Sequence, residues 1–204
     1  MTTTTVGSGR TRRGHATHDR LLNAARAELI ENEGQMELAA VARRAGVSPG
    51  LPYRYFESKS ALLVAVVEGF FDSLDEVVYR PVFAEVSDDW WEREKVRIEK
   101  MVEFFYDEPL GPYVATQLAG DAAVAATKTR RATQRVRGAT ANVETGKRLG
   151  RVPAFIDAEL SGACLMGGVE QAIHLALTHS PKIARARVVE QLQAFMRNVL
   201  QIEE

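Results

Sequence analysis

Three residues in the C-terminal half have side chains suited to catalysis or metal binding. Glu170 and His174 lie four residues apart and share one face of a helix, whereas Cys164, ten residues before His174, lies on a different face. No second histidine completes a His-Glu-x-x-His zinc motif, and a single cysteine excludes an internal disulfide and a paired-thiol zinc site. We therefore expect no enzymatic activity, no metal and no cofactor, and we assign Cys164 to the hydrophobic core.

A different chemistry is indicated by residues 45–63, which read AGVSPGLPYRYFESKSALL. Gly46 suits a left-handed turn between two short helices, because glycine adopts positive φ without a steric penalty. Ser48 suits the N-cap of the second helix, over residues 48–55, and Pro49 its first position, where no amide donor is needed. The spacing therefore predicts a helix-turn-helix.

The same segment carries groups suited to a nucleic-acid backbone. Free amides at a helix start attract phosphate, and Gly50 lets that backbone approach closely. Tyr53 and Tyr55 supply hydroxyl groups, and Lys59 supplies a cation. Residues 1–60 hold nine Lys and Arg against six Asp and Glu, and the remaining residues hold 17 against 21. This asymmetry favours a polyanion partner for the front of the chain, although a chance imbalance of solvated faces is the alternative.

Apolar periodicity predicts an all-α chain of about nine helices, with no strand alternation. Among the inward-facing positions are Leu22 in the first helix, Val77 in the fourth and Trp91 in the fifth. Ser58 and Ser180 are expected as N-caps of the fourth and last helices, with Pro181 opening the last. The helices are expected at about residues 17–34, 37–44, 48–55, 58–80, 88–106, 109–118, 121–147, 157–178 and 181–201.

Residues 18–70 resemble the N-terminal domain of the tetracycline-repressor (TetR) family of bacterial transcriptional regulators. The resemblance lies in RLLNAARAELIENEG (residues 20–34) and VARRAGVSPGLPYRYFESKSALL (residues 41–63). It implies that the helix over residues 48–55 enters the DNA major groove. The implied contacts are Ser48, Pro49, Gly50, Leu51 and Arg54 at the bases or groove, Tyr53, Tyr55 and Lys59 at phosphates, and Arg43 and Arg44 near the backbone.

Two positions depart from the family pattern. Pro52 stands where the family usually has a leucine-like residue, so the recognition helix is expected either to begin as a tighter turn or to begin only near Pro52. Glu37 stands near the place of a phosphate-binding threonine and favours a helix dipole but not a phosphate. A basic arm carrying Arg12 and Arg13 is a candidate replacement contact, and a solubilising tail is the alternative.

Residues 1–16 are rich in Thr, Gly, Ser and Arg without a periodic apolar pattern, so we expect a flexible basic arm there. The resemblance further implies a helix-turn-helix DNA-binding domain (17–62) and a larger ligand-binding and dimerisation domain (63–204). A homodimer would place two recognition helices about one DNA turn apart on a palindromic double-stranded operator. Apolar and small residues in the last two helices are the expected dimer interface, with intramolecular core as the alternative. These residues are Gly162, Met166, Val169, Val188, Leu192, Phe195, Met196 and Val199.

Aromatic and sulfur-containing residues gather in the second domain and predict an apolar pocket for a small lipophilic effector, with ordinary core packing as the alternative. The candidate lining is Trp91, Met101, Phe104, Phe105, Tyr113, Gln117, Cys164 and His174.

No apolar run is long enough to cross a membrane, and no signal peptide is recognised, so a cytoplasmic protein without membrane contact is expected. The sequence thus predicts a ligand-responsive repressor in which the effector tilts the helix at residues 58–80. The alternative is a helix-turn-helix regulator whose second domain binds a protein partner instead of a metabolite.

Overall fold

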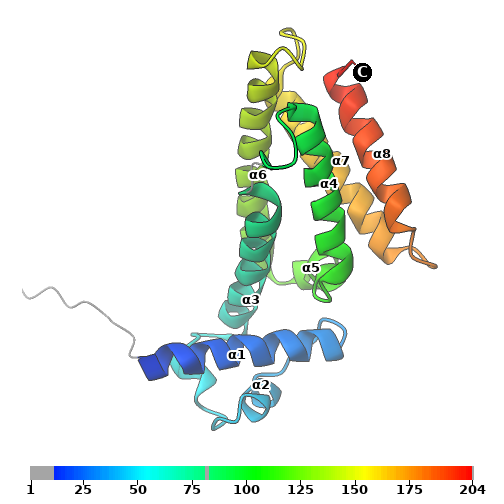
Figure 1. Cartoon of the computed structure of the whole chain (residues 1–204). Coiled ribbons are helices and arrows are strands. Elements are labelled where there is room, and N and C mark those ends of the chain that lie inside the picture. The colour runs from blue at the N-terminus through cyan, green and yellow to red at the C-terminus, as the bar shows by residue number, and fades with distance from the viewer. Residues whose placement is uncertain (1–11, 81–82, 204) are drawn as a thin grey trace, which may run out of the picture. The chain divides into compact units, whose positions relative to one another are not determined.

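The computed structural model describes residues 12–80 and 83–203, which contain α-helices and no β-strand (Figure 1). The all-helical class, with a helix-turn-helix domain before a larger helical domain, is confirmed. Two compact units divide after Val66, and α3 continues through that boundary. The α-helices are α1 (Arg12–Glu31), α2 (Leu38–Arg44), α3 (Lys59–Leu74), α4 (Trp90–Asp107), α5 (Gly111–Ala115), α6 (Ala122–Arg148), α7 (Ala158–Thr178) and α8 (Arg185–Leu200); the short segments are η1 (Pro52–Arg54) and η3 (Gln117–Gly120), both 3₁₀, and η2 (Asp75–Tyr79), a π-helix.

The core of the N-terminal unit lies between the apolar faces of α1 and α2. Leu21, Leu29 and Val41 are completely buried. The expectation for Leu22 was wrong, because this side chain is only half-buried and its neighbour Leu21 faces the core. Leu21 and Leu29 are eight residues apart, which keeps them on one helical face, and adjacent residues are separated by about 100° around the axis.

An ion-pair cluster ties α1 to α2 on the outside of this core. The buried carboxylate of Glu28 accepts a hydrogen bond from Arg44 Nε at 2.7 Å, and Arg44 Nη1 donates to Glu31 Oε1 at 2.9 Å. The hydrogen bonds that Arg44 donates, first those to Glu31 and second that to Glu28, raise the pKa of Arg44. Arg44 therefore carries a structural role in the unit.

The fourth predicted helix begins as expected but changes its periodicity near its end. Ser58 Oγ accepts a hydrogen bond from the Ala61 amide at 3.0 Å, which confirms Ser58 as the N-cap. After α3 the chain forms the π-helical segment η2, which takes up an extra residue per turn. Val78 is therefore buried, and the prediction that Val77 faces the core was wrong, since Val77 is 42% exposed.

In the second unit, α6 and α8 lie on either side of α7, and α4 lies beside α8 (Figure 1). Glycines permit the close helix contacts. A Cβ atom at Gly162 would lie 2.9 Å from the Thr140 backbone nitrogen on α6, and one at Gly168 would lie 2.7 Å from Phe195 Cε1 on α8. The small residues of α7 therefore serve packing within one chain at these two positions.

Several local expectations in this unit need correction. The last helix begins at Arg185 and not at Pro181, because the preceding loop is held elsewhere: Tyr106 Oη donates to the Ile183 carbonyl at 2.7 Å. Trp90, 2% exposed, takes the core position expected for Trp91. Its indole Nε1 donates to Asn142 Oδ1 at 3.2 Å, which satisfies the one polar atom of the buried ring. Cys164 is exposed, so its assignment to the core was wrong.

Candidate functional sites

The turn after α2 is closed by the hydrogen bonds of a Schellman motif. Val47 N donates to Ala42 O at 3.0 Å and Gly46 N donates to Arg43 O at 3.1 Å, with Gly46 at φ +64°. Arg20 on α1 donates to the carbonyl groups of Ala45 and Gly46. The predicted left-handed glycine is confirmed, and α1 fixes the turn in place.

The segment after the turn is tighter than a regular α-helix. Leu51 N donates to Ser48 O at 2.9 Å and Arg54 N donates to Leu51 O at 3.0 Å, both over three residues, and Pro52 is buried at the start of η1. Ser48 supplies its backbone carbonyl, and no side-chain cap forms at η1, so the expected Ser48 N-cap was wrong. Of the two effects expected from Pro52, both appear: a tight turn comes first, and η1 begins at Pro52.

The outer side of this segment is open. Ser48, Pro49 and Gly50 are exposed, and a Cβ atom placed on Gly50 would meet nothing within 4 Å. Tyr53 is 61% exposed, an unusual exposure for a large aromatic side chain. The fold therefore does not require glycine at position 50 or an aromatic ring at position 53.

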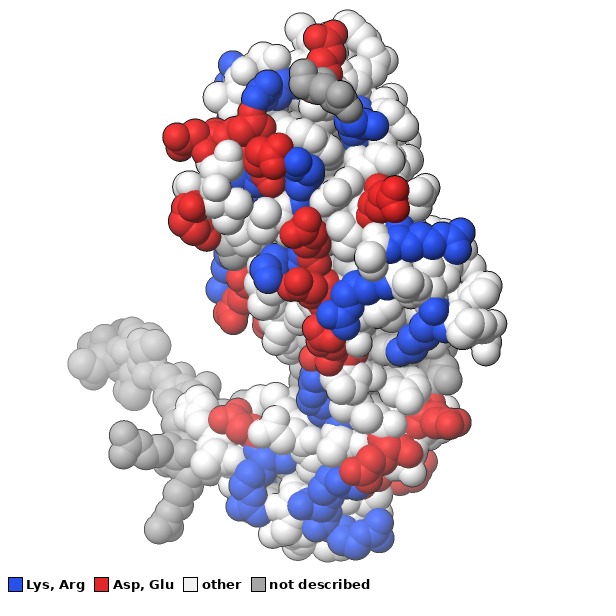
Figure 2. All heavy atoms as spheres, turned by 45° about the vertical axis from the view of Figure 1, so that its right-hand side comes forward, with Lys and Arg blue, Asp and Glu red and all other residues white. Residues whose placement is uncertain are grey.

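The cationic side chains near this segment differ in whether they form ion pairs. Arg43 and Arg54 are exposed and have no ion-pair partner within residues 12–80 and 83–203. Lys59 Nζ lies 3.2 Å from Glu37 Oε1 in a surface pair, which is weak enough to be exchanged for a phosphate. Figure 2 shows several Lys and Arg side chains close together on one face of the N-terminal unit.

The remaining predicted DNA contacts are more enclosed. Leu51 and Tyr55 are half-buried, and the Tyr55 ring centroid lies 6.5 Å from that of His18 on α1. Arg44 is engaged by Glu28 and Glu31. Among the expected contacts, the structure thus leaves the outer turn, Tyr53, Arg43 and Arg54 most accessible. Residues 1–11, and the side chains of Arg12 and Arg13, lie outside the described part of the chain. The predicted extent of the arm was wrong for residues 12–16, because α1 already begins at Arg12.

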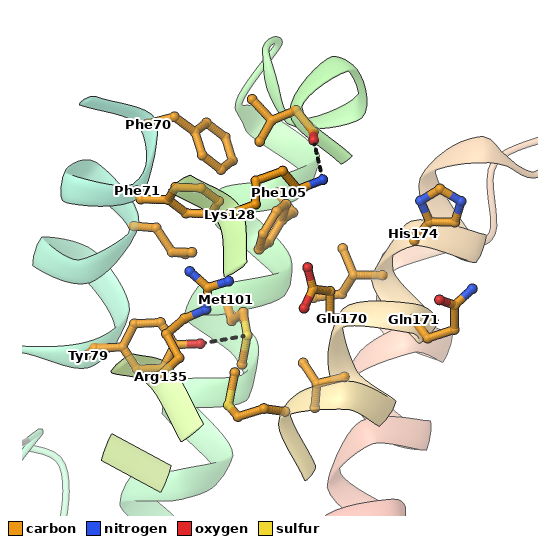
Figure 3. Close-up of a pocket in the computed structure, with 15 residues that line it drawn as sticks. Phe70, Phe71, Tyr79, Met101, Phe105, Lys128, Arg135, Glu170, Gln171 and His174 are labelled. Carbon is orange, nitrogen blue, oxygen red and sulfur yellow. Dashed lines mark hydrogen bonds between the residues drawn. The ribbon is translucent and has the colours of Figure 1, made fainter. Parts of the chain in front are cut away.

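The second unit contains a cavity of about 260 Å³ between α3, α4, α6 and α7 (Figure 3). Its wall is largely aromatic and aliphatic, and this composition is typical of a small-molecule site. Of the predicted lining residues, Met101, Phe105 and His174 lie in this wall. The full lining is Phe70, Phe71, Leu74, Tyr79, Met101, Phe105, Val114, Lys128, Arg135, Met166, Val169, Glu170, Gln171, Ile173 and His174.

The other predicted lining residues lie elsewhere. Phe104 packs edge-on against Phe70 behind the wall, with ring centroids 5.3 Å apart, and Trp91 borders a separate surface groove. Neither Tyr113 nor the exposed Cys164 lines the cavity. The side chain of Gln117 lies outside the described part of the chain.

The polar groups of the wall were not expected from the sequence. Lys128 Nζ donates to the Val114 carbonyl at 2.8 Å, and desolvation lowers the pKa of Lys128. Desolvation raises the pKa of Tyr79 to about 12, so its hydroxyl is neutral and donates toward Met101 Sδ at 3.7 Å. Arg135 and Glu170 complete the charged lining. A signal was present: Lys128, Arg131 and Arg135 follow three- and four-residue spacing on one face of α6 in an otherwise acidic half of the chain.

Arg131, between the two cavity cations on that face, joins α6 to the helix that leads from the N-terminal unit. Its Nε donates to Glu68 Oε2 at 2.7 Å and its Nη1 to Asp75 Oδ2 at 3.1 Å, and it also pairs with Asp72. The Arg131 side chain is only 13% exposed, so solvent screens its pairs with Glu68 and Asp75 less than its pair with Asp72, which is 58% exposed. These ion pairs therefore hold α6 against α3 about one helical turn from Arg135.

The predicted dimer residues are largely used within one chain. Gly162, Val169, Val188 and Leu192 are buried, and Met166, Val169 and Met196 line cavities, while Phe195 and Val199 pack against the core beside α8. A different face of α7 remains open and apolar: Leu160 is 66% exposed, Leu175 is 54% exposed, and Cys164 and Gly167 lie between them. This open face of α7 is therefore a candidate surface for a partner.

Two other kinds of site are absent from the described residues. No helix there is long and apolar enough to cross a membrane. No group of three or more His, Cys, Asp or Glu side chains in residues 12–80 and 83–203 is arranged to hold a metal ion.

Comparison with known proteins identifies the class to which these features belong. Residues 21–66 match the family model described as bacterial regulatory proteins, tetR family. The N-terminal segment is therefore a tetR-family domain, as the residues at its turn indicated. This segment thus matches a family of regulatory proteins over the part of the chain that holds the helix-turn-helix.

Solved structures extend the likeness over the whole chain. A TetR-family transcriptional regulator from Pectobacterium atrosepticum has a TM-score of 0.79 at 22% identity, over 96% of this chain and 100% of that chain. GusR from Salmonella enterica has a TM-score of 0.75 at 18% identity, over 95% of this chain and 100% of that chain. FadR from Bacillus subtilis, in complex with stearoyl-CoA, has a TM-score of 0.69 at 16% identity, over 88% of this chain and 97% of that chain. At these identities the likeness establishes the fold alone. No curated protein matches the chain.

Proposed function

We propose that this protein is a transcriptional repressor that binds a palindromic operator as a homodimer and is released by a small lipophilic effector. The observation that carries the DNA-binding part is the open turn at residues 48–50. Its glycine has free space in front, and Tyr53, Arg43 and Arg54 lie near it in sequence with accessible side chains. Such a surface lets the protein backbone approach the phosphates of a DNA strand closely.

The cavity in the second unit supports a metabolite effector over a protein partner. A largely apolar cavity of about 260 Å³ is not needed in a flat protein interface, and its volume lies near the lower end of the range of ligand sites. The stearoyl-CoA bound by FadR is a precedent for a lipophilic effector in this fold. A ligand in the cavity of this chain would contact α6, and Arg131 would pass a shift of α6 to α3.

The homodimer is proposed to use the open apolar face of α7. Leu160 and Leu175 lie on that face, and a helix pair from each of two subunits would cover them. A twofold dimer would present two recognition segments to one face of DNA, about one duplex turn apart. Release requires only that the effector favour the non-binding arrangement by about 1.4 kcal/mol for each tenfold loss of affinity.

Selection of bound duplexes from a random pool tests this function. We expect a palindrome whose half-sites are spaced for two recognition segments. With the selected duplex, Tyr53→Phe and Lys59→Ala should weaken binding to all sequences alike and reduce the salt dependence, whereas Arg54→Ala should change the preferred bases. Arg187→Ala, at an exposed arginine of α8 in the second unit, is the control. Failure to retain any duplex at low ionic strength would refute the proposal.

A further inference from the structure

The wall of the cavity contains one buried guanidinium nitrogen without a hydrogen-bond acceptor. Within the described part of the chain, Arg135 Nη1 is buried and has no hydrogen-bond partner. The Arg135 guanidinium carbon lies 4.7 Å from the centroid of the Phe71 ring, so one side of the group rests on an aromatic wall. Buried donors are nearly always paired, and charged ones most of all. This orphan donor therefore marks the place of an acceptor that the chain itself does not supply.

We infer that the cavity binds a small apolar carboxylate, with its anionic head on Arg135 and its tail among the aromatic and sulfur-containing side chains. The inference rests on the proposed function in that it names the chemical class of the effector. A carboxylate matches the fork of donors on a guanidinium and makes charge-assisted hydrogen bonds, which a neutral ligand cannot reproduce.

The charges of the wall agree with an anion. Lys128 and Arg135 are two cations, and Glu170 is the single carboxylate in the lining, so the wall carries an excess of one positive charge. Figure 3 shows these three side chains reaching the same space from α6 and α7. Asp75 is the other acid close to Arg135, but its carboxylate accepts from Arg131. A cationic ligand would meet both Lys128 and Arg135, and a neutral one would leave the excess charge uncompensated.

The rest of the wall defines the tail. A second cavity of about 200 Å³ adjoins the first and shares Tyr79, Met101, Met166 and Val169 as a common wall. Methionine side chains change rotamer readily, so a tail directed at this wall has room to extend. Tyr79 adds no competing negative charge, because its hydroxyl stays protonated at neutral pH. A medium-length acyl chain or a single aryl ring fits these dimensions.

Calorimetric titration of the full-length protein tests the inference with two matched pairs, octanoate with octanamide and 4-phenylbutanoate with its amide. We expect at least one acid to bind about ten- to a hundredfold more tightly than its amide, the range typical of a charge-assisted hydrogen bond. Arg135→Gln should remove this preference and leave amide binding unchanged. Arg137→Gln, an exposed arginine on the same helix and outside the lining, should keep it.

The outcomes separate this inference from the proposed function. Equal affinity for acid and amide, no binding of either acid, or an unchanged preference in Arg135→Gln would each overturn it. If Arg135→Gln does not fold, as judged by circular dichroism, the contrast between acid and amide in the wild-type protein decides, together with Arg135→Lys, which keeps the charge. The DNA titration described above uses no ligand, so a regulator whose cavity rejects carboxylates would still bind its duplex.

Discussion

Two alanine substitutions, at Gly46 and at Gly50, should separate the folding of the turn from its recognition of DNA. Gly46 has φ +64°, and a Cβ atom there would lie 3.4 Å from Arg20 Nη2, an ordinary contact. The cost of Gly46→Ala therefore comes from the backbone and should be about 1–2 kcal/mol. For a chain of this size that corresponds to a fall in Tm of roughly 2–8 °C. Gly50 has no positive φ and open space around it, so Gly50→Ala should change stability by less than about 0.5 kcal/mol.

Binding should show the opposite order. A methyl group on Gly50 would stand between the backbone and the phosphate that approaches it, and we expect about a tenfold loss of affinity, or about 1.4 kcal/mol. Gly46→Ala should lose less affinity at temperatures where it is folded. Thermal unfolding by circular dichroism and anisotropy titration of the selected duplex at two salt concentrations give both quantities. Full affinity in Gly50→Ala would refute the idea that this turn closely approaches DNA.

Three further predictions concern the second unit. Arg131→Gln should leave effector and DNA binding nearly intact but reduce the effector-induced release of DNA, since it removes the pairs to α3; unchanged release in an anisotropy assay would contradict this. Leu160→Glu should shift the protein from dimer to monomer in sedimentation velocity, whereas Leu149→Glu, 55% exposed and outside α7, should not; a dimeric Leu160→Glu would exclude that face. Because desolvation lowers the pKa of Lys128 below 10.5, the affinity for a carboxylate should fall as pH rises from neutral toward 10.5. The substitution Lys128→Met should remove that fall. A carboxylate affinity that does not change with pH in the wild-type protein would contradict a role for the Lys128 charge.

The same lowered pKa has a consequence for stability with a defined sign. A lysine whose pKa falls on folding is penalised in its charged form, and this penalty is fully present below the folded pKa. Deprotonation removes the penalty, so the Lys128 contribution to stability should improve as pH rises through the folded pKa toward 10.5. Ligand affinity and the stability of the free protein should therefore move in opposite directions over this window.

Features set by short-range rules were predictable from the sequence. The positive φ of Gly46 and the cap formed by Ser58 depend on residues within one turn, so residue type and spacing are enough. Val78 could not be chosen over Val77, because periodicity assumes a uniform helix and η2 is a π-helix. The start of α8 at Arg185 depends on a hydrogen bond between residues 77 positions apart, which no local pattern contains.

The apolar lining of the cavity was predictable from the sequence, but its charged lining residues were not. Met101 and Phe105 were found because aromatic and sulfur-containing residues mark such walls, whereas Arg135 and Lys128 look like solvated residues on a polar helix. Only the packing of α6 beside α7 shows that this cationic stripe faces inward. The exposure of Cys164 was missed for the reverse reason, since a small apolar residue type gives no indication of which side of a helix will be covered.

A coupling route follows from the two arginines on one face of α6. Arg131 and Arg135 are four residues apart, about 6 Å along the helix axis. Arg131 pairs with three acidic residues of α3 and η2, and Arg135 lines the cavity with an unpaired Nη1. Any ligand that pairs with Arg135 acts on the same helical turn that holds α3. The helix α3 begins at Lys59 in the N-terminal unit and ends at Leu74 in the second unit, so the attachment at Arg131 acts on a helix that belongs to both units. In the proposed function, an effector alters DNA affinity only as far as its binding differs between the DNA-binding and released states. We therefore expect the size of the response to depend on the charge of Arg135 and on the ion pairs of Arg131.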